Sequence, residues 1–483
     1  MRFTSSIPIV VALCCLGGSA YADDTSDTMT FRLSETSTLA LTETATGKWD
    51  LESMVHEALA RSWQIDVAKA QIEQAEALYS FAASQAYPRM TLNSLFGGPT
   101  PEARTVVTND PSTATPASLE GDFDFGELGV GFRVNGEAFL PLYTFGKISK
   151  GKEAASHVVR AAGHQRTVTE AEVVVNVTRA FWAYQLTRTF LNSLDDGRGT
   201  LEKVLEKIEE LLDNDSPQVT ENDRLRLKYA LSTLLVRETE AKQAREIALR
   251  ALRLLMGWDQ SRRLEVADAE LADLPDKIPS LFEATESAQG GRPELLALRE
   301  IVKATEAFAE LRRRQFYPDI YLGGVLQWAY TSNATNQTNP FVNDPFNFFN
   351  LAAGLGVRIE LDIFQKLALL EQAEAEAKVR IAQTRLAEQA VELDVQRIHI
   401  EISGGYDRIA KLERANRTAR GWLTASSLAY DIGTGAADEL IDAFLAWAAS
   451  EADLQRTRFD TLIRLTELSR ATGRLVQARS GGE

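Results

Sequence analysis

The chain of 483 residues contains only two cysteines, Cys14 and Cys15, both close to its start. If that segment is a leader that is removed, the mature protein has no thiol, which excludes disulfides and cysteine metal sites. The four histidines are scattered, with no pair four residues apart, so we expect no metal site. No glycine-rich phosphate loop and no nucleophile elbow occurs. The sequence therefore indicates neither a cofactor nor catalysis, and we expect that the protein is not an enzyme.

Long apolar runs are also missing. A transmembrane helix needs about twenty apolar residues in succession, and the sequence has no such run. The short apolar stretch Ile7–Leu16 follows Met1-Arg2 and precedes Ala20-Tyr21-Ala22, which is typical of a secretory signal peptide over residues 1–22. An exported chain without such a helix can span a membrane only as a closed barrel. The net charge of −16 argues against a nucleic-acid partner, which requires a basic surface.

Proline is absent between Pro141 and Pro217 and again after Pro345. These gaps hold two predicted helices, Lys147–Leu212 and Lys366–Tyr430, rich in Ala, Glu, Leu and Arg. Each has about 65 residues, which corresponds to roughly 100 Å of helix. Rods of this length are expected to pack as a coiled coil or a helical tube. After a turn, a shorter helix returns along each rod, at Thr220–Met256 and Asp438–Gly473.

A long internal repeat organises the chain. Leu51–Pro88 and Leu281–Pro318 align without a gap, and each begins with a helical run and ends in aromatic-Pro. A period this long means that one large unit is used twice. By length, we expect each return helix to continue end to end into the first helix of the other repeat, Thr220–Met256 into Arg292–Phe316 and Asp438–Gly473 into Leu51–Ala86. The predicted segments are a signal peptide (1–22), an irregular lead-in (23–48), the first repeat (49–258), an equatorial connector (259–280), the second repeat (281–474) and a tail (475–483).

Between the helices of each repeat the apolar residues follow a period of two, which predicts strands over 88–98, 127–143, 318–331 and 348–363. In the second strand the even positions from Leu128 to Leu142 are apolar, and the odd positions include Arg133 and Glu137. Residues 103–121 and 331–347 are expected to form hairpin loops. A soluble antiparallel sheet with one wet face also alternates in this way. Strands of about 10–15 residues, however, have the length that spans a membrane.

Aromatic residues cluster at the predicted strand ends, which is typical of the two interfaces of a membrane barrel. One chain supplies only four strands, too few to close a barrel, so we expect copies to associate around a symmetry axis. Two copies would give eight strands and three would give twelve. The aromatic residues at the predicted membrane interfaces are Tyr87, Tyr143, Phe145, Phe316, Tyr317, Trp328, Tyr330 and Phe364.

The order helix, strand hairpin, long helix, turn and return helix, used twice after a signal peptide, resembles the TolC-type outer-membrane efflux channels. The most specific part of the resemblance is the segment 429–443, with a Tyr-x-x-Gly turn and an acid pair three residues apart. The resemblance implies mixed α and β structure: four membrane strands per chain that close as a twelve-stranded β-barrel in a homotrimer, above a periplasmic tube of long antiparallel helical hairpins. It implies the outer membrane of a Gram-negative bacterium. It also implies a channel that is driven by an inner-membrane transporter through a periplasmic adaptor protein.

The same resemblance places the pore constriction at the turn beyond the long helices. Gly435 stands where a known family member carries arginine, so we expect closure to rest more on packing and less on charge. The carboxylates of Glu439 and Asp442 share one face of a helix near its N-terminus, where the helix dipole favours negative charge. On local grounds they could equally be a helix cap. The residues assigned to the constriction are Tyr430, Gly433, Glu439, Asp442 and Asp223.

Two alternatives remain open at this point. The first is an exported coiled-coil spacer of the cell envelope that conducts nothing, and the second is an exported enzyme on a helical scaffold. A spacer predicts bulky apolar residues on the inner face, whereas Gly129, Gly131, Gly354 and Gly356 lie at the inward positions. The cargo could be drugs, metal ions or protein, because the pump selects it.

Overall fold

The computed structural model describes residues 47–108, 118–214, 219–275, 277–334, 344–432 and 434–475. The expected signal peptide, nearly all of the lead-in and nearly all of the tail lie outside the described residues. The chain divides into two units, Met1–Gly47 and Lys48–Glu483, and the elements below belong to the second.

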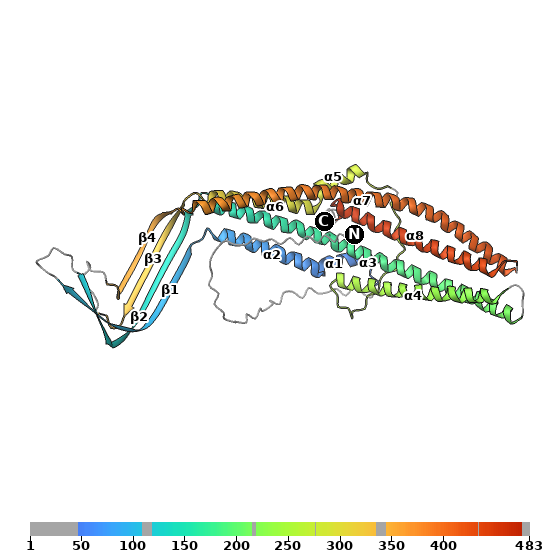
Figure 1. Ribbon diagram of the computed structural model, residues 1–483, viewed down its shortest axis with the longest axis horizontal. Helices are drawn as coiled ribbons and strands as arrows, with labels where there is room; N and C mark the ends of the chain where they lie inside the picture. The colour runs from blue at the N-terminus through green and yellow to red at the C-terminus, as the bar shows by residue number, and fades with distance from the viewer. Residues whose placement is uncertain are drawn as a thin grey trace. The chain divides into compact units, whose positions relative to one another are not determined.

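Two helices of unusual length dominate this unit. They are α3 (Lys147–Asp213) and α7 (Ile363–Asp431), and each is followed by a shorter return helix, α4 (Glu221–Leu255) or α8 (Ala437–Ala471). Their residues favour helix, and no proline interrupts them. In Figure 1 the return helices run back alongside the long helices, and the strands lie beyond the opposite end of the long helices.

The first helix of each repeat is broken, although the first repeat was expected to hold one helix over Leu51–Ala86. The structure has α1 (Leu51–Arg61) and α2 (Trp63–Ser84), and likewise α5 (Leu281–Gly291) and α6 (Pro293–Arg314). Ser62 and Arg292 adopt extended backbone between the two pieces. In the second repeat Pro293 stands at the first turn of α6, where its missing N–H costs nothing. The first break has no proline, so composition did not indicate it.

Four antiparallel strands form one sheet in the order β1-β2-β3-β4. They are β1 (Arg89–Thr108), β2 (Ser118–Tyr143), β3 (Asp319–Thr331) and β4 (Phe348–Arg358). The first hairpin is longer than expected: most of the predicted loop 103–121 is strand, paired beyond register shifts at Gly97/Thr100 and Pro101/Glu102. The last strand is shorter than the predicted 348–363: it ends at Arg358, and α7 begins at Ile363.

The register places apolar residues of all four strands on one face of the sheet. Phe132 pairs with Phe96 and Tyr330, and the Phe132 and Trp328 rings pack edge to face with centroids 5.3 Å apart. On the opposite face an unbroken row of amides crosses the sheet, formed by Asn93, Asn135, Gln327 and Asn350. We call these two sides the apolar face and the polar face. A one-residue slip would exchange them in any strand, so the pairing is strongly specified.

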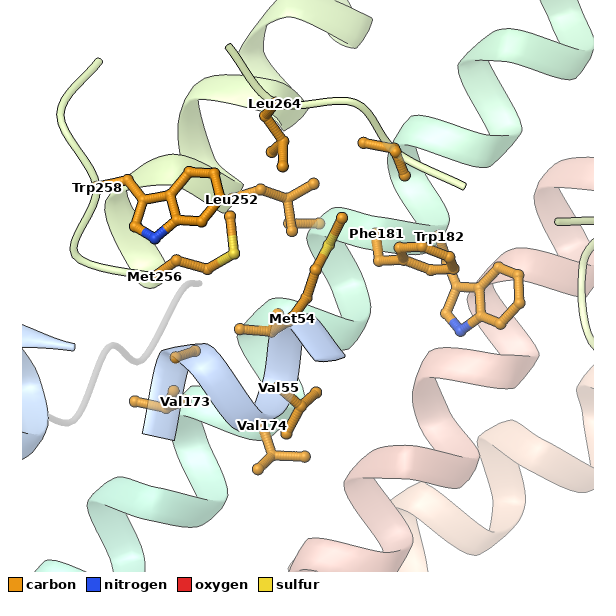
Figure 2. Packing of buried hydrophobic residues seen from close by; sticks show 14 of the residues in the cluster. Met54, Val55, Val173, Val174, Phe181, Trp182, Leu252, Met256, Trp258 and Leu264 are labelled. Atoms are coloured by element: carbon orange, nitrogen blue, oxygen red, sulfur yellow. The ribbon is translucent and has the colours of Figure 1, made fainter. Parts of the chain in front are cut away.

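The split rods form within each repeat, which corrects the expected pairing. The end of α4 meets α1 and α2, where Leu252 and Met256 join Met54 and Ile65 in one buried cluster, part of which is shown in Figure 2. The indole N–H of Trp258, just past α4, donates to Glu57 Oε1 at 2.9 Å. Helix lengths alone could not separate the two pairings, because α2 and α6 are equally long.

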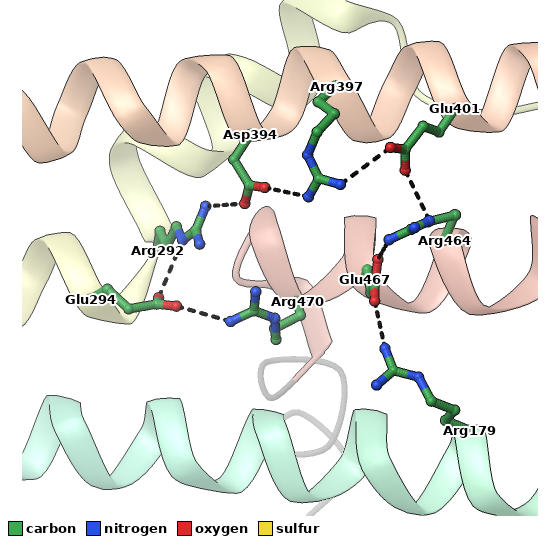
Figure 3. Close-up of polar contacts among 9 residues, drawn as sticks. All are labelled: Arg179, Arg292, Glu294, Asp394, Arg397, Glu401, Arg464, Glu467 and Arg470. Carbon is green, nitrogen blue, oxygen red and sulfur yellow. Dashed lines mark hydrogen bonds and ion pairs between the residues drawn. The ribbon is translucent and has the colours of Figure 1, made fainter. Parts of the chain in front are cut away.

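The corresponding junction between α8 and α6 is held by charge. Arg470 of α8 lies 3.2 Å from Glu294 of α6, and Glu294 also pairs with Arg292. Arg292 then contacts Asp394 on α7 at 3.1 Å. Figure 3 shows this chain of alternating charges continuing across α7 and α8 to α3, through Arg397, Glu401, Arg464, Glu467 and Arg179.

A second charged cluster joins α3 to α6 nearer the sheet. The buried Glu300 carboxylate lies 2.7 Å from His157 Nδ1, Arg160 Nε and Lys303 Nζ. Burial by itself would raise the pKa of Glu300, but the hydrogen bonds from Lys303, Arg160 and His157 outweigh it and lower the pKa to about 2. The carboxylate therefore stays charged at neutral pH and ties the two helices together.

Candidate constriction at the helical tips

The tips of the two helix pairs share one apolar cluster. Side chains from α3, α4, α7 and α8 meet at the end of the helices that lies away from the sheet (Figure 1). Leu227 of α4 and Ile441 of α8 are almost completely buried in it. The remaining buried members are Leu201, Ile208, Val219, Ala230, Leu234, Tyr430, Ala437, Leu440 and Phe444.

Tyr430, assigned to the constriction, lies inside this cluster with 7% of its surface exposed. Its ring receives Lys207 Nζ at 4.8 Å from the centroid, a cation–π contact from α3. Burial raises the pKa of the Tyr430 hydroxyl, and the negative charges of Asp223 and Asp431 raise it further. Among the described residues no group hydrogen-bonds this hydroxyl. Tyr430 therefore fastens the two helix pairs of one chain together, and its hydroxyl has unused bonding capacity.

Glu439 and Asp442 both lie on the exposed side of α8, as their spacing predicted. They follow the helix N-terminus closely, where acids are favoured by the dipole. The N-cap residue of α8 is Ala436, which has no side-chain hydrogen bond, and within the first turn Asp438 Oδ1 accepts the Glu439 backbone N–H at 2.8 Å. Neither acid caps α8 through a side-chain hydrogen bond at the N-cap, and their part in a constriction stays a prediction.

Arg226 of α4 is the residue that sequence reasoning missed. Its Nη2 donates to both carboxylate oxygens of Asp442 at 3.1 Å, and its Nη1 lies 3.6 Å from Asp438. We call this group, Arg226 with Asp438 and Asp442, the tip clasp. The expectation that closure at this end rests more on packing and less on charge stays a prediction, and the structure adds this ion pair between α4 and α8 to it. No local signal marks Arg226, since its role follows from the contact between α4 and α8 in space.

The turn between α7 and α8 is tight at Gly435, the position where a known family member carries arginine. The backbone N–H groups of Thr434 and Gly435 both donate to Ala429 O, which satisfies the end of α7. A Cβ at Gly435 would come within 2.8 Å of the Tyr430 backbone nitrogen. The turn closes tightly because this position has no side chain. Gly433, also assigned to the constriction, lies outside the described residues.

Asp223 was assigned to the constriction as well, and in the structure it has a local role. It forms a capping box with Thr220 at the start of α4: Thr220 N donates to Asp223 Oδ2 at 2.9 Å, and Asp223 N donates to Thr220 Oγ1 at 3.3 Å. It is half-buried and acts electrostatically on Tyr430. It therefore belongs to the same tip.

Most of the predicted interface aromatics lie where strands meet helices. The Phe145 ring stacks on Tyr317 and packs edge-on against Tyr143, with centroids 5.6 and 4.7 Å away. Phe145 has a backbone φ of 51°, which residues other than glycine rarely adopt, and this conformation lets the chain turn from β2 into α3. Tyr87, Tyr317 and Phe364 are mostly exposed, Phe316 is half-buried, and Trp328 lies further along β3 towards its outer end.

Two features are absent from the described residues. Across 47–475 with its stated gaps, no three His, Cys, Asp or Glu residues are grouped so that they could hold a metal ion. In the same part of the chain, every helix is too short or too polar to cross a membrane.

Comparison with known proteins agrees with this geometry. Residues 284–474 match the family model described as outer membrane efflux protein. Outer membrane protein TolC of Vibrio cholerae is 20% identical over 326 residues, which cover 67% of this chain and 72% of that protein. The outer-membrane channel OprN superposes with a TM-score of 0.70 at 15% identity, over 88% of this chain and 89% of that one. The outer membrane protein VceC of Vibrio cholerae gives 0.67 at 16%, over 88% and 96%.

Over residues 284–474 the chain matches the family of outer membrane efflux proteins. In sequence it is similar to TolC, and its fold is that of the outer-membrane channels compared here. It is accordingly a protein of the Gram-negative outer membrane with a large periplasmic part. The related proteins are channels and not enzymes.

Proposed function

We propose that three copies of this chain form the exit duct of an efflux or type I secretion system. The duct has no catalytic activity of its own, and an inner-membrane pump drives it through a periplasmic adaptor. The observation that carries the proposal is the four-stranded sheet, with one apolar face, one polar face and two open edges. Such a sheet is stable in lipid only when its edges are paired, and three copies give twelve strands.

A stripe on α7 supports assembly between copies. Val379, Leu386, Leu393 and Ile400 are each more than half exposed and recur every seven residues. This is the spacing of a coiled-coil seam. We call these four residues the α7 stripe. Their exposure on a single chain is explained if a second copy covers them.

The chain order indicates which helix covers the stripe. The edge strand β4 leads into α7, and α2 leads into the other edge strand, β1. When β4 of one copy pairs with β1 of the next, α7 and α2 of the two copies become neighbours. Helix α2 exposes its own apolar residues, among them Trp63 at 69%, Val67 at 59% and Phe81 at 52%. We infer that these two surfaces form the helical part of the interface.

The polar face of the sheet lines the lumen in this assembly, and the apolar face contacts lipid. The amide row would continue around the barrel as a ring of uncharged groups. Two of the four inward glycines do not simply leave space, however. Tyr321 lies against Gly356, and Asn333 lies over Gly129. Gly354 has no neighbouring atom within 4 Å on its side-chain side.

The tips form the gate in this proposal. In the closed state, each copy holds α4 to α8 through the tip clasp and through the apolar cluster that contains Tyr430. Three-fold symmetry would gather Glu439 and Asp442 of all copies around one axis, where the field attracts cations. We therefore expect cation selectivity and block by multivalent cations from the periplasmic side.

Assembly tests the proposal directly. Leu386→Asp with Leu393→Asp places two charges in the α7 stripe and should abolish the trimer, measured as molar mass by light scattering in detergent. The matched control, Leu225→Asp with Tyr229→Asp, alters exposed residues of α4 near the tips, outside the inferred α7–α2 contact. A stable wild-type monomer, or a stripe variant that remains trimeric, would contradict the proposed interface. Deleting the gene should also sensitise cells to exported compounds, and the wild-type gene should restore resistance.

A further inference from the structure

Phe139, Tyr321 and Arg358 lie together on the polar face of the sheet, near the end of the strands that is joined to the helices. They come from β2, β3 and β4, which are neighbours in the sheet. The Phe139 and Tyr321 rings have centroids 4.7 Å apart, with 33° between their planes. Arg358 reaches across β3, and its Cζ lies 4.6 Å from the centroid of the Phe139 ring. We call these three residues the aromatic ledge.

Two glycines leave room for the Tyr321 ring to lie along the sheet. A Cβ at Gly356, the residue opposite Tyr321 on β4, would come within 2.6 Å of Tyr321 Cζ. A Cβ at Gly323, two residues further along β3, would come within 3.1 Å of Tyr321 Cε2. The ring therefore covers positions on both strands, and its other side is turned away from the sheet. In this orientation a second flat ring can stack on it.

Arg358 has no ion-pair partner in the part of the chain that the structure describes. The register places Asp319 opposite Arg358, but Asp319 Oδ1 instead accepts from Lys147 Nζ at 2.8 Å. Arg358 is exposed, and its guanidinium is held beside the Phe139 ring. A guanidinium presents its N–H groups as a planar fork that matches the two oxygens of a carboxylate. The ledge thus offers an aromatic surface and an uncompensated positive charge side by side.

We propose that the aromatic ledge is a binding site for flat aromatic carboxylates in the lumen of the channel. The ring of such a solute stacks on Tyr321, and its carboxylate accepts from the guanidinium of Arg358. The inference rests on the proposed function, in which the polar face lines the lumen. Three copies place three ledges around the passage where the barrel meets the helical tube. An aliphatic carboxylate lacks the ring and a neutral aromatic lacks the charge, so each should bind more weakly.

Binding of para-fluorobenzoate to purified trimers in detergent, titrated through its fluorine NMR signal, tests this inference. Cyclohexanecarboxylate is the first competitor, with the same charge and a similar size but no flat ring. Benzamide is the second, with the flat ring but no charge. Benzoate should displace the probe at concentrations roughly fivefold lower than cyclohexanecarboxylate, the advantage expected from one aromatic contact. Benzamide should displace it least.

Variants of the ledge assign the binding to its residues. Tyr321→Leu should weaken probe binding roughly fivefold, and Arg358→Gln roughly tenfold, because a hydrogen-bonded charge is lost. Gly356→Ala pushes the Tyr321 ring aside without altering any ledge residue and should also weaken binding. Gly354→Ala is its matched control, since a Cβ there meets no atom within 4 Å. Arg133→Gln removes a positive charge from the same face nearer the outer end, and both controls should bind the probe as the wild type does.

Conductance of the wild-type trimer in a planar bilayer separates this inference from the proposed function. Light scattering first establishes that each variant is a trimer, and Tyr321→Leu and Arg358→Gln decide the matter if Gly356→Ala fails to assemble. A wild-type trimer that conducts but does not bind the probe would overturn the ledge site alone. Ledge variants that bind the probe as tightly as the two controls would do the same. A wild-type trimer that does not conduct would overturn the proposed function and, with it, a site in the lumen.

Discussion

Arg226→Gln should shift the proposed gate towards the open state. The substitution keeps the polarity and most of the length of the side chain but removes the charge that faces Asp438 and Asp442. All three side chains of the tip clasp are close to half exposed, so solvent screens the interaction. Exposed ion pairs contribute about 0.2–1 kcal/mol each, and we take ~0.5 kcal/mol per copy. Three copies then lose about 1.5 kcal/mol, which corresponds to roughly a tenfold rise in the open-to-closed ratio.

Open probability in single-channel recordings at low salt measures this shift. Because the Debye length falls to about 3 Å at 1 M salt, the difference between variant and wild type should shrink as salt is added. Arg237→Gln is the matched control, since Arg237 pairs only with Glu240 on its own helix among the contacts described. Arg226→Asp combined with Asp442→Arg should restore part of the closure.

The reasoning is refuted if Arg226→Gln and Arg237→Gln have the same open probability as the wild type at low salt. It is also refuted if the effect of Arg226→Gln is the same at high salt, because the clasp would then act through packing.

Three further predictions concern the sheet, the acids at the tip and a buried carboxylate. Phe132→Arg puts a charge on the apolar face, which contacts lipid, at a cost of about 2–4 kcal/mol, and it should reduce trimer yield far more than Asn135→Arg on the polar face. Equal yields would contradict the assignment of the apolar face to lipid. Glu439→Ala with Asp442→Ala should abolish block by multivalent cations while the trimer survives heating in detergent as the wild type does; block as tight as in the wild type would mean that the gate is misplaced. Because the pKa of Glu300 is lowered, its contribution to stability is complete above its unfolded value and is lost as pH falls towards about 2. Glu300→Gln should therefore destabilise the fold at pH 7 by on the order of 2 kcal/mol. The melting temperature of the variant should also fall less than that of the wild type as the pH is lowered from about 4.5 to 2. An equal fall would show that the Glu300 charge does not contribute to stability.

The regular elements were predictable because their signals are local. The period of two between Leu128 and Leu142 is a property of the strand itself, and the register confirms that these residues share one face. The stretches without proline likewise predicted the two ends of α3 and of α7 to within a few residues. The helix break at Ser62 was missed, since no proline or glycine marks it, and the length of the first hairpin was missed because loop-like composition hid the pairing beyond the bulges.

What the sequence could not supply were contacts between distant segments. Helix lengths allowed two ways of joining the rods, and only the packing of Leu252 and Met256 against Met54 decided between them. Arg226 was missed for the same reason, because its partners lie more than two hundred residues away. Gly129 was interpreted as leaving space on the inner face, but the side chains of Ser332 and Asn333, just past the end of β3, lie against it.

The central claim, a conducting channel made of three copies, is tested most directly by one measurement on the purified protein. Particles shown by light scattering to have three times the monomer mass are inserted into a planar bilayer, and single-channel currents are recorded with monovalent salt on both sides. The account predicts discrete, cation-selective openings that multivalent cations block from the periplasmic side. Trimers that insert but carry no current at any voltage, with or without the Arg226→Gln substitution, would contradict it and favour a structural spacer.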